Sequence, residues 1–414
     1  MRVVWWATGR GLRERPLGPL VWLATTNSLS WAAVPESANT WERLADLPLA
    51  IDSYTLEPLQ ALVSSEFERK STVIHMTGAG QEGTGEDVTY DAVDHEILQT
   101  AGPSLPLGGS WTIGSFCERV AQLDLFPQEP QREVSRRYRV WAYESAALDL
   151  ALRQAGTTLH EALGRTPEPV RFVVSLRLGE PPSMDPIRRR LDAYPGLRFK
   201  LDPTSSWSES LIAELVETGS VESVDFKGYY SGSIVDQAPD PVLYRRVAEA
   251  FPDAWIEDPA LTPETDAALA AHRERFSWDA PIHSVADIEA LPYPPRMVNI
   301  KPSRLGGLEN LLDAFDFCAE HGIGNYGGGQ FELGVGREQI QYLASIFHAD
   351  APNDVAPTGY NLPEPPAGLP ESPLSPMPSA LGFRFDPLKI NSGSGRTHVP
   401  NPLSHSLTST NDCS

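Results

Sequence analysis

The sequence predicts an α/β protein, a (β/α) barrel joined to a smaller α+β domain. Three observations support this prediction. The 414 residues suffice for one barrel of roughly 200–250 residues and a second domain. After about residue 168, short apolar runs alternate with amphipathic segments, a pattern typical of parallel strands linked by helices. Several runs also end in a charged residue, where such barrels place their active sites.

The first domain is expected over 46–165. Strand-like segments occupy 52–76 and lead into a glycine-rich link, and a further strand follows. From Glu133 to Gln154 apolar residues recur at helical spacing, and Gly156 is a plausible end of that helix. The glycines of the link are Gly78, Gly80, Gly83 and Gly85.

Both ends of the chain lack a regular pattern. Residues 1–45 show no steady periodicity, so we expect a disordered or wrongly assigned extension; a secretory signal is the less favoured interpretation. In 363–414 prolines accumulate first. One strand-like piece at 380–385 is expected to return to the first domain, and the polar tail after it is expected to be disordered.

The barrel is expected over 166–362, with a doubly wound open sheet as the structural alternative. Helical segments lie between the runs, and in 308–321 the apolar residues share one face. The eight predicted strands are 171–178, 197–202, 221–227, 254–258, 276–280, 296–301, 323–327 and 354–357.

Five successive runs carry a charged residue on their inward face near the C-terminal end. Three neighbouring carboxylates repel one another unless a positive charge lies between them, and a hard divalent cation such as Mg²⁺ meets that need. A lysine near a cation can act as a base, and the metal would stabilise an enolate. The five residues are Lys200, Asp225, Glu257, Asp279 and Lys301.

These motifs resemble the enolase superfamily in its muconate-lactonising branch, which includes o-succinylbenzoate synthases, N-acylamino acid racemases and dipeptide epimerases. The likeness covers about 130–360 and is weaker through 55–100. The segments that carry it are Arg198-Phe199-Lys200, Trp255-Ile256-Glu257-Asp258-Pro259, Ser277-Trp278-Asp279, Val298-Asn299-Ile300-Lys301-Pro302 and the glycine-rich segment 328–337.

The resemblance implies a capping α+β domain on a modified (β/α) barrel. It implies a lyase or isomerase that removes a proton next to a carboxylate, nearest to the dehydration of an o-succinylbenzoate synthase. Racemisation or epimerisation of N-acylamino acids or dipeptides is the alternative. Lys200 and Lys301 would be the acid/base pair, and Asp225, Glu257 and Asp279 would hold Mg²⁺. The residues expected to contact the substrate are Arg198, Lys227, Gly328, Gly329 and Glu332.

Two departures from the family pattern put Mg²⁺ in doubt. Lys227 stands two residues after Asp225, where the family usually has asparagine, and Ala280 follows Asp279 where glutamate is common. One interpretation keeps the metal. The other has the Lys227 ammonium pair with Asp225 and weaken or replace it, which leaves open a non-catalytic barrel that only binds ligands.

A phosphate site is a further alternative for the glycines at 327–329, because glycine-rich backbone before a helix can bind phosphate. It leaves the charged strand ends unexplained. Glu332 lines the pocket or provides a charge at the start of the next helix.

Composition limits the partners. With 33 Lys and Arg against 55 Asp and Glu, the net charge of −22 disfavours nucleic acid and anionic membranes. We expect a small carboxylate substrate and allow a homo-oligomer. The three cysteines show no metal-ligand spacing and suit a reducing compartment, so a cytoplasmic protein is expected.

Overall fold

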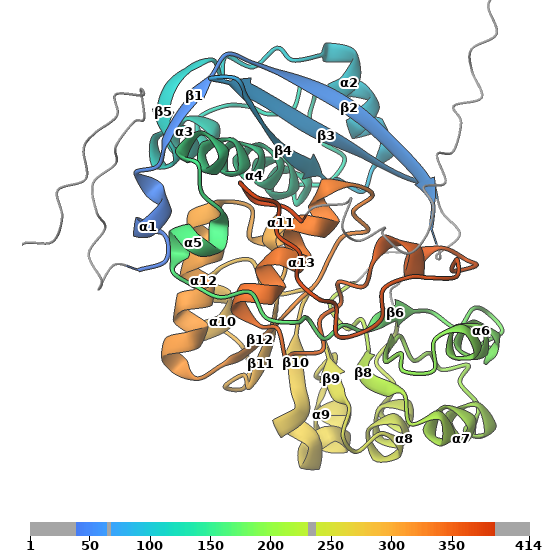
Figure 1. Ribbon diagram of the computed structural model, residues 1–414. Coiled ribbons are helices and arrows are strands. Elements are labelled where there is room, and N and C mark those ends of the chain that lie inside the picture. The colour runs from blue at the N-terminus through green and yellow to red at the C-terminus, as the bar shows by residue number, and fades with distance from the viewer. Residues whose placement is uncertain (1–38, 64–67, 231–236, 386–414) are drawn as a thin grey trace, which may run out of the picture. The chain divides into compact units, whose positions relative to one another are not determined.

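The computed structural model describes residues 39–63, 68–230 and 237–385 (Figure 1). The expected extension before residue 39 and the expected tail from residue 386 lie outside the described residues. No helix among the described residues is long and apolar enough to cross a membrane.

The last seven residues of the expected extension are packed. Helix α1 covers Glu42–Ala45, and its Leu44 is fully buried. Just before it, the backbone N–H of Thr40 donates to Asp316 Oδ2 at 2.7 Å. A single buried leucine carries no periodicity, so the sequence pattern could not distinguish this short helix from an unstructured segment.

The N-terminal domain is α+β, as expected. Its three-stranded antiparallel sheet has the order β2-β3-β4, and a separate pair joins β1 to β5. The strands are β1 Pro48–Ile51, β2 Ser53–Leu62, β3 Glu68–Gly78, β4 Gln81–Asp87 and β5 Gly109–Thr112. The helices are α2 Ala92–Ala101, α3 Ile113–Ala121, α4 Ser135–Ala155 and α5 Leu159–Leu163.

Helix α4 organises this domain and confirms the predicted helix, including its end at Gly156 in the left-handed conformation. In Figure 1 it packs beneath the three-stranded sheet. The glycine-rich link is, however, largely a strand. Gly83 and Gly85 lie within β4, because α4 crosses so close that a Cβ on either would lie 2.2 Å from helix backbone atoms.

Gly83→Ala should therefore destabilise the protein by about 2 kcal/mol or more, as overpacking against backbone does. The added methyl would lie 2.2 Å from the Leu150 amide nitrogen. Urea unfolding measures the loss. Gly108→Ala is the matched control, because its nearest neighbour would be 3.6 Å away, and it should change stability by less than about 0.5 kcal/mol. Equal stabilities would contradict the close packing.

The second domain contains a seven-stranded parallel sheet in the order β12-β11-β10-β9-β8-β7-β6. Seven of the eight predicted strands are confirmed, each shorter than its apolar run. They are β6 Val174–Leu176, β7 Phe199–Leu201, β8 Val221–Asp225, β9 Trp255–Glu257, β10 Phe276–Trp278, β11 Met297–Ile300 and β12 Gly324–Gly327.

The eighth predicted strand is wrong as a strand, although this segment does close the barrel. Asp354 makes a parallel bridge to Gly328 beyond β12, and Asn353 makes one to Phe172 before β6. The Asn353 side chain replaces further ladder bonds: its Oδ1 accepts from Gly327 N at 2.7 Å and its Nδ2 donates to Arg171 O at 3.0 Å. One segment thus joins both sheet edges, which a doubly wound open sheet does not do.

Helices connect these strands, as the alternating pattern predicts, and α12 matches its predicted range. The connecting elements are α6 Asp185–Ala193, α7 Glu209–Thr218, α8 Pro241–Ala250, α9 Pro263–Leu269, the 3₁₀ helix η1 Ala270–Arg275, α10 Val285–Glu289, α11 Pro302–Leu305, α12 Leu308–His321, α13 Val335–Phe347 and the 3₁₀ helix η2 Thr358–Asn361.

The strand-like piece at 380–385 forms single bridges and no regular strand, but it does contact the first domain. Gly382 bridges Thr158, and the Phe383 N–H donates to Asp149 Oδ1 of α4 at 2.8 Å. The Phe383 ring packs edge-on against Trp141 of the same helix. These contacts tie the end of the described chain to α4.

Candidate active site

The charged residues of the strand ends meet at the C-terminal end of the barrel sheet. Asp225 ends β8 and Glu257 ends β9, and the two are register partners in neighbouring strands. Asp279 and Lys301 directly follow β10 and β11. All four are at most 6% exposed, so the cluster is buried.

Lys200 lies at the centre of one part of this cluster. It is on β7 and is 1% exposed. Its Nζ is paired with Glu257 Oε1 and lies 3.2 Å from Asp225 Oδ2 and 3.7 Å from Asp354 Oδ2. The other oxygen of Glu257 accepts from Tyr326 Oη at 2.5 Å. The lysine ammonium is therefore surrounded by carboxylates.

Lys301 forms a second group around Asp279. Its Nζ donates to Asp279 Oδ2 at 2.8 Å, and Arg304 Nη1 donates to Oδ1 at 2.6 Å. Tyr230 Oη also donates to Asp279 Oδ2, at 3.2 Å. Both oxygens of this carboxylate are thus occupied by protein donors.

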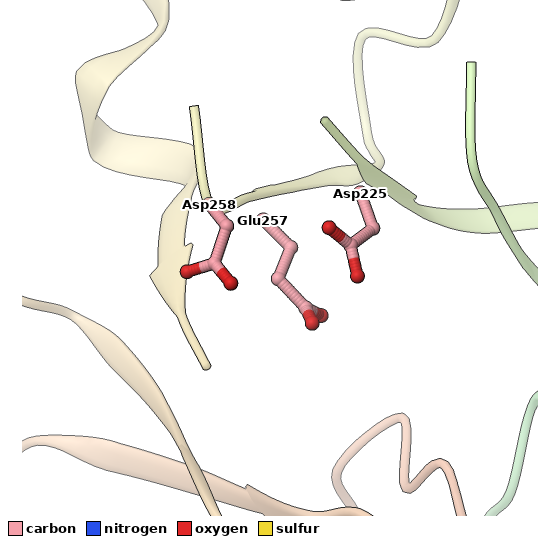
Figure 2. Close-up of side chains that lie close together, drawn as sticks. All are labelled: Asp225, Glu257 and Asp258. Atoms are coloured by element: carbon pink, nitrogen blue, oxygen red, sulfur yellow. The ribbon is translucent and has the colours of Figure 1, made fainter. Parts of the chain in front are cut away.

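Three buried carboxylates lie close enough to hold a metal ion, but they are not the expected three. Figure 2 shows Asp225, Glu257 and Asp258, which each offer one oxygen such that the three atoms lie within 4.8 Å of one another. Asp258 stands where Asp279 was expected. Its two oxygens accept from the backbone N–H groups of Asp279 at 2.9 Å and Ala280 at 2.8 Å.

The two lysines differ in their preferred charge. Burial lowers the pKa of Lys301, and although Asp279 opposes this, the charges of Arg304 and Lys200 add to the lowering. Burial would also lower the pKa of Lys200, but Glu257 and Asp225 outweigh it and raise that pKa well above its usual value. Lys301 is therefore more easily deprotonated, whereas Lys200 remains an ammonium.

Two of the carboxylates also differ in how readily they bind a proton. Burial would raise the pKa of Asp279, but Arg304 and Lys301 outweigh it and hold that pKa far below its usual value. Burial, together with the charges of Asp279 and Asp225, raises the pKa of Asp258 to about 7. Asp279 thus stays charged at neutral pH, whereas Asp258 is balanced between its two forms.

The structure does not bring Arg198 to this site. Arg198 is exposed, precedes β7 at its N-terminal end, and donates to Gly219 O. It lines a surface cavity of about 1100 Å³ together with Arg165 and Arg171. The alternation along the strand placed Arg198 on the inner face. Strand β7 is so short, however, that a residue two positions before Lys200 already lies at the opposite end of the barrel.

The glycine-rich segment after β12 is divided between two roles. A Cβ on Gly328 would lie 2.5 Å from Lys301 Cε, so glycine leaves room for that side chain. Gly329 leaves room for Glu332, whose Oε2 pairs with Arg337 Nη2 at 2.9 Å and whose Oε1 accepts from Gln330 N at 2.6 Å. Glu332 is thus buried in an ion pair of its own with Arg337.

A phosphate site at this segment is excluded by Glu86 of the first domain. Its fully buried carboxylate accepts from the backbone N–H groups of Leu333 at 2.7 Å, Gly334 at 2.9 Å and Gly336 at 3.0 Å. These are the donors at the start of α13 that a phosphate would need. They instead join the first domain to the rim of the barrel.

Two family profiles match the chain. The C-terminal domain of DUF8230, described as a domain of unknown function, matches residues 166–362, and the N-terminal domain of DUF8230 matches residues 42–162.

Curated relatives include o-succinylbenzoate synthases and N-succinylamino acid racemases. The synthase of Bacillus subtilis is 26% identical over 51% of this chain and 57% of its own length. The racemase of Thermus thermophilus is 25% identical over 76% of this chain and 84% of its own. The chain therefore spans less than two thirds of the length of the Bacillus subtilis synthase. It likewise spans only 59% of the length of the synthase from Geobacillus kaustophilus.

Solved structures share the fold. A probable mandelate racemase from Alicyclobacillus acidocaldarius has a TM-score of 0.56 at 21% identity, covering 76% of this chain and 87% of its own. An enolase-superfamily member from Listeria innocua has a TM-score of 0.54 at 18% identity, covering 75% and 86%. The two profiles together cover most of the chain, which therefore belongs to the DUF8230 family, and its fold is that of enolase-superfamily proteins.

The structure adds site residues that the sequence patterns missed. Asp258 follows Glu257 directly, so strict alternation assigned it to the outer face, but the strand has ended and its φ of +46° turns the side chain inward. Arg304 lies one helical turn after Lys301, on α11. That i, i+3 spacing was the signal available in the sequence. Tyr230 and Tyr326 gave no such signal.

Proposed function

We propose that this enolase-superfamily chain is an enzyme that removes a proton from the carbon next to a substrate carboxylate. The observation that carries the proposal is the pair of buried lysines at the ends of β7 and β11, with their charge preferences driven apart. Groups whose surroundings drive their pKa values apart suit opposite roles as acid and base. The names of the curated relatives support the same chemistry, since they include a racemase and a synthase.

In this proposal neutral Lys301 takes the proton and the Lys200 ammonium stabilises the enolate or returns a proton to it. Arg304 and Asp279 position the Lys301 amine, and Gly328 gives it space. Charge on the enolate oxygen develops in a buried place, where a fixed ammonium acts more strongly than it would in water. A small carboxylate is the substrate class that this arrangement fits.

Mg²⁺ is the cofactor that the superfamily implies, and as a Lewis acid it would stabilise the enolate. Asp225, Glu257 and Asp258 are near enough to one another to hold a metal ion. However, Asp279, the third ligand expected from the sequence, is saturated by Lys301 and Arg304. The predicted ligand set does not fit a divalent ion unless these cations are displaced, so the proposed reaction depends on the side chains of the chain alone.

Exchange of the substrate α-proton tests this proposal directly. An N-succinylamino acid, the class named for the racemase relatives, is incubated with the protein in D₂O, and the loss of its α-proton signal is followed by NMR. We expect exchange that requires Lys301. The test is repeated with both configurations of the N-succinylamino acid and with several amino-acid side chains. Binding of these ligands without any exchange would favour the non-catalytic barrel.

Two substrates separate racemisation from dehydration, and the N-succinylamino acid tests the first. If both lysines reach the substrate carbon from opposite faces, the two configurations should both exchange, and the optical rotation should fall to zero. A dehydration needs a different substrate, a carboxylate with a hydroxyl group on the carbon next to the acidic one. The α-proton and that hydroxyl then leave as water, and the alkene accumulates. Dehydration like that of an o-succinylbenzoate synthase remains the first candidate, because three of the curated relatives carry that name.

A further inference from the structure

We propose that the ammonium group of Lys227 is the built-in cation of this centre, and that the chain therefore works without a divalent metal ion. The inference rests on the proposed function only for what the cation does in the reaction. Its presence rests on the turn that follows β8.

The backbone holds Lys227 in an unusual conformation. Its φ is +54°, in the left-handed region that side chains other than glycine rarely adopt. Its N–H donates to Asp225 Oδ1 at 3.0 Å, and the next N–H, of Gly228, donates to Asp258 O at 2.9 Å. A Cβ on Gly228 would lie 2.3 Å from Ala260 N, so the turn packs closely on the neighbouring strand's continuation.

This turn directs the lysine side chain back over the carboxylates. Lys227 Nζ lies 2.5 Å from Asp225 Oδ2 and 3.6 Å from Asp202 Oδ1. It also lies 5.3 Å from the centre of the Tyr230 ring, whose face attracts a cation. Only 14% of the side chain is exposed. The ammonium is thus partly desolvated and held by three different groups.

The carboxylate oxygens that a metal ion would need already have protein donors. Asp225 Oδ1 accepts from the Lys227 N–H, and its Oδ2 lies beside both Lys227 and Lys200. Glu257 is bound by Lys200 and Tyr326, and both oxygens of Asp258 accept backbone N–H groups. A metal would have to displace these donors and then remain next to two ammonium groups.

The distribution of lysines supports the same conclusion. The described part of the chain contains four lysines, Lys70, Lys200, Lys227 and Lys301, and all but Lys70 lie in this centre. Lys200, Lys227 and Arg304 place three positive charges among Asp202, Asp225, Glu257 and Asp279, and Lys301 adds a fourth when it is protonated. Protein side chains therefore supply most of the positive charge that the buried carboxylates require.

An ammonium acts differently from a metal ion. It carries one charge and donates hydrogen bonds, so it can bind a substrate carboxylate and the oxygen of its enolate without Lewis-acid coordination. The substrate carboxylate would replace some of the contacts that Lys227 makes with Asp202 and Asp225. Lys227 and Lys200 would then both donate hydrogen bonds to the oxygens on which the negative charge of the enolate develops.

Calorimetric titration with Mg²⁺ alone tests the inference. We expect the wild type to show no saturable binding at millimolar Mg²⁺, and Lys227→Asn to bind it at least about tenfold more tightly, because a positive charge has been removed from beside the carboxylates. Lys70→Asn, which removes the lysine of an exposed pair with Glu96, is the control and should behave as wild type.

Two results would overturn the inference. Equal and tight binding in the wild type and in Lys227→Asn would show that the lysine does not exclude the metal. Absence of binding in both would show that Lys227 is not what excludes it. Circular dichroism first establishes that the variant is folded, and Lys227→Gln replaces it if it is not.

Thermal unfolding of the wild type gives a second measurement that needs no variant. A bound ion raises the melting temperature by mass action, so we expect the same melting temperature in EDTA and in 10 mM Mg²⁺. A rise with Mg²⁺ would count against the inference. Neither measurement involves a substrate, so failure of the α-proton exchange would refute the proposed function and leave this result to be judged by itself.

Discussion

Replacing Lys301 by alanine is expected to slow α-proton exchange by about 10²–10⁴-fold, which is the usual loss when a general base is removed. The lysine is 6% exposed, its amine is held 2.8 Å from Asp279, and its pKa is lowered by burial first. The measurement is the NMR exchange rate per mole of folded protein. Exchange at the wild-type rate would remove Lys301 from the reaction.

Lys200→Ala should cause a similar loss of exchange and a loss of stability as well. Its ammonium is the direct partner of Glu257 and lies near Asp225, so the variant leaves buried carboxylates without their cation. Urea unfolding separates the two effects. Lys70→Ala is the control for both lysines, because its side chain makes only an exposed pair on the first domain.

Arg139→Met is expected to destabilise the protein by about 3–5 kcal/mol, the usual cost of removing one partner of a buried ion pair. Arg139 Nε lies 2.8 Å from Asp87 Oδ2, and both side chains are fully buried. The guanidinium also lies 3.6 Å from the centre of the Phe126 ring and donates to Asp94 O at 3.1 Å. Methionine preserves much of the packing but leaves the Asp87 carboxylate unpaired.

The pH dependence of the free energy of unfolding reveals the contribution of the Arg139–Asp87 ion pair. Burial would raise the pKa of Asp87, but Arg139 and His95 outweigh it and lower the pKa to about 2. Since the folded value lies below the ordinary aspartate value, the pair stabilises the fold above about pH 4. It contributes about 2 kcal/mol there, and this contribution is lost as the pH falls toward 2. The difference in the free energy of unfolding between the wild type and Arg139→Met should therefore become smaller as the pH falls from 4 to 2.

Arg132→Met is the matched control for Arg139, because Arg132 pairs with Asp91 at 3.1 Å but is 57% exposed. An exposed pair of this kind contributes less than about 1 kcal/mol. Urea unfolding at pH 7 and near pH 3 gives all three stabilities. If the loss of unfolding free energy in Arg139→Met is the same at both pH values, the loss comes from packing and not from the ion pair.

The residue pattern predicted most of the architecture. The alternation of apolar runs and amphipathic helices predicted seven strands of the barrel and the whole of α12, and the helical spacing before Gly156 predicted α4. These features depend on neighbours in the chain, because burying one face of a strand or helix requires a regular spacing that a sequence shows directly. The inward charges at five strand ends follow from the same alternation.

Which charges meet depended on the tertiary structure. Asp279 lies with Lys301 and Arg304, Lys227 turns back onto Asp225, and Asp258 enters the cluster through a left-handed backbone. Short strands also put Arg198 at the far end of the barrel, although it shares a face with Lys200. Alternation gives the side of a strand on which a residue lies but not its height along the barrel or its partner. Height and partner are set by the register between strands and by turns, where the two-residue period ends.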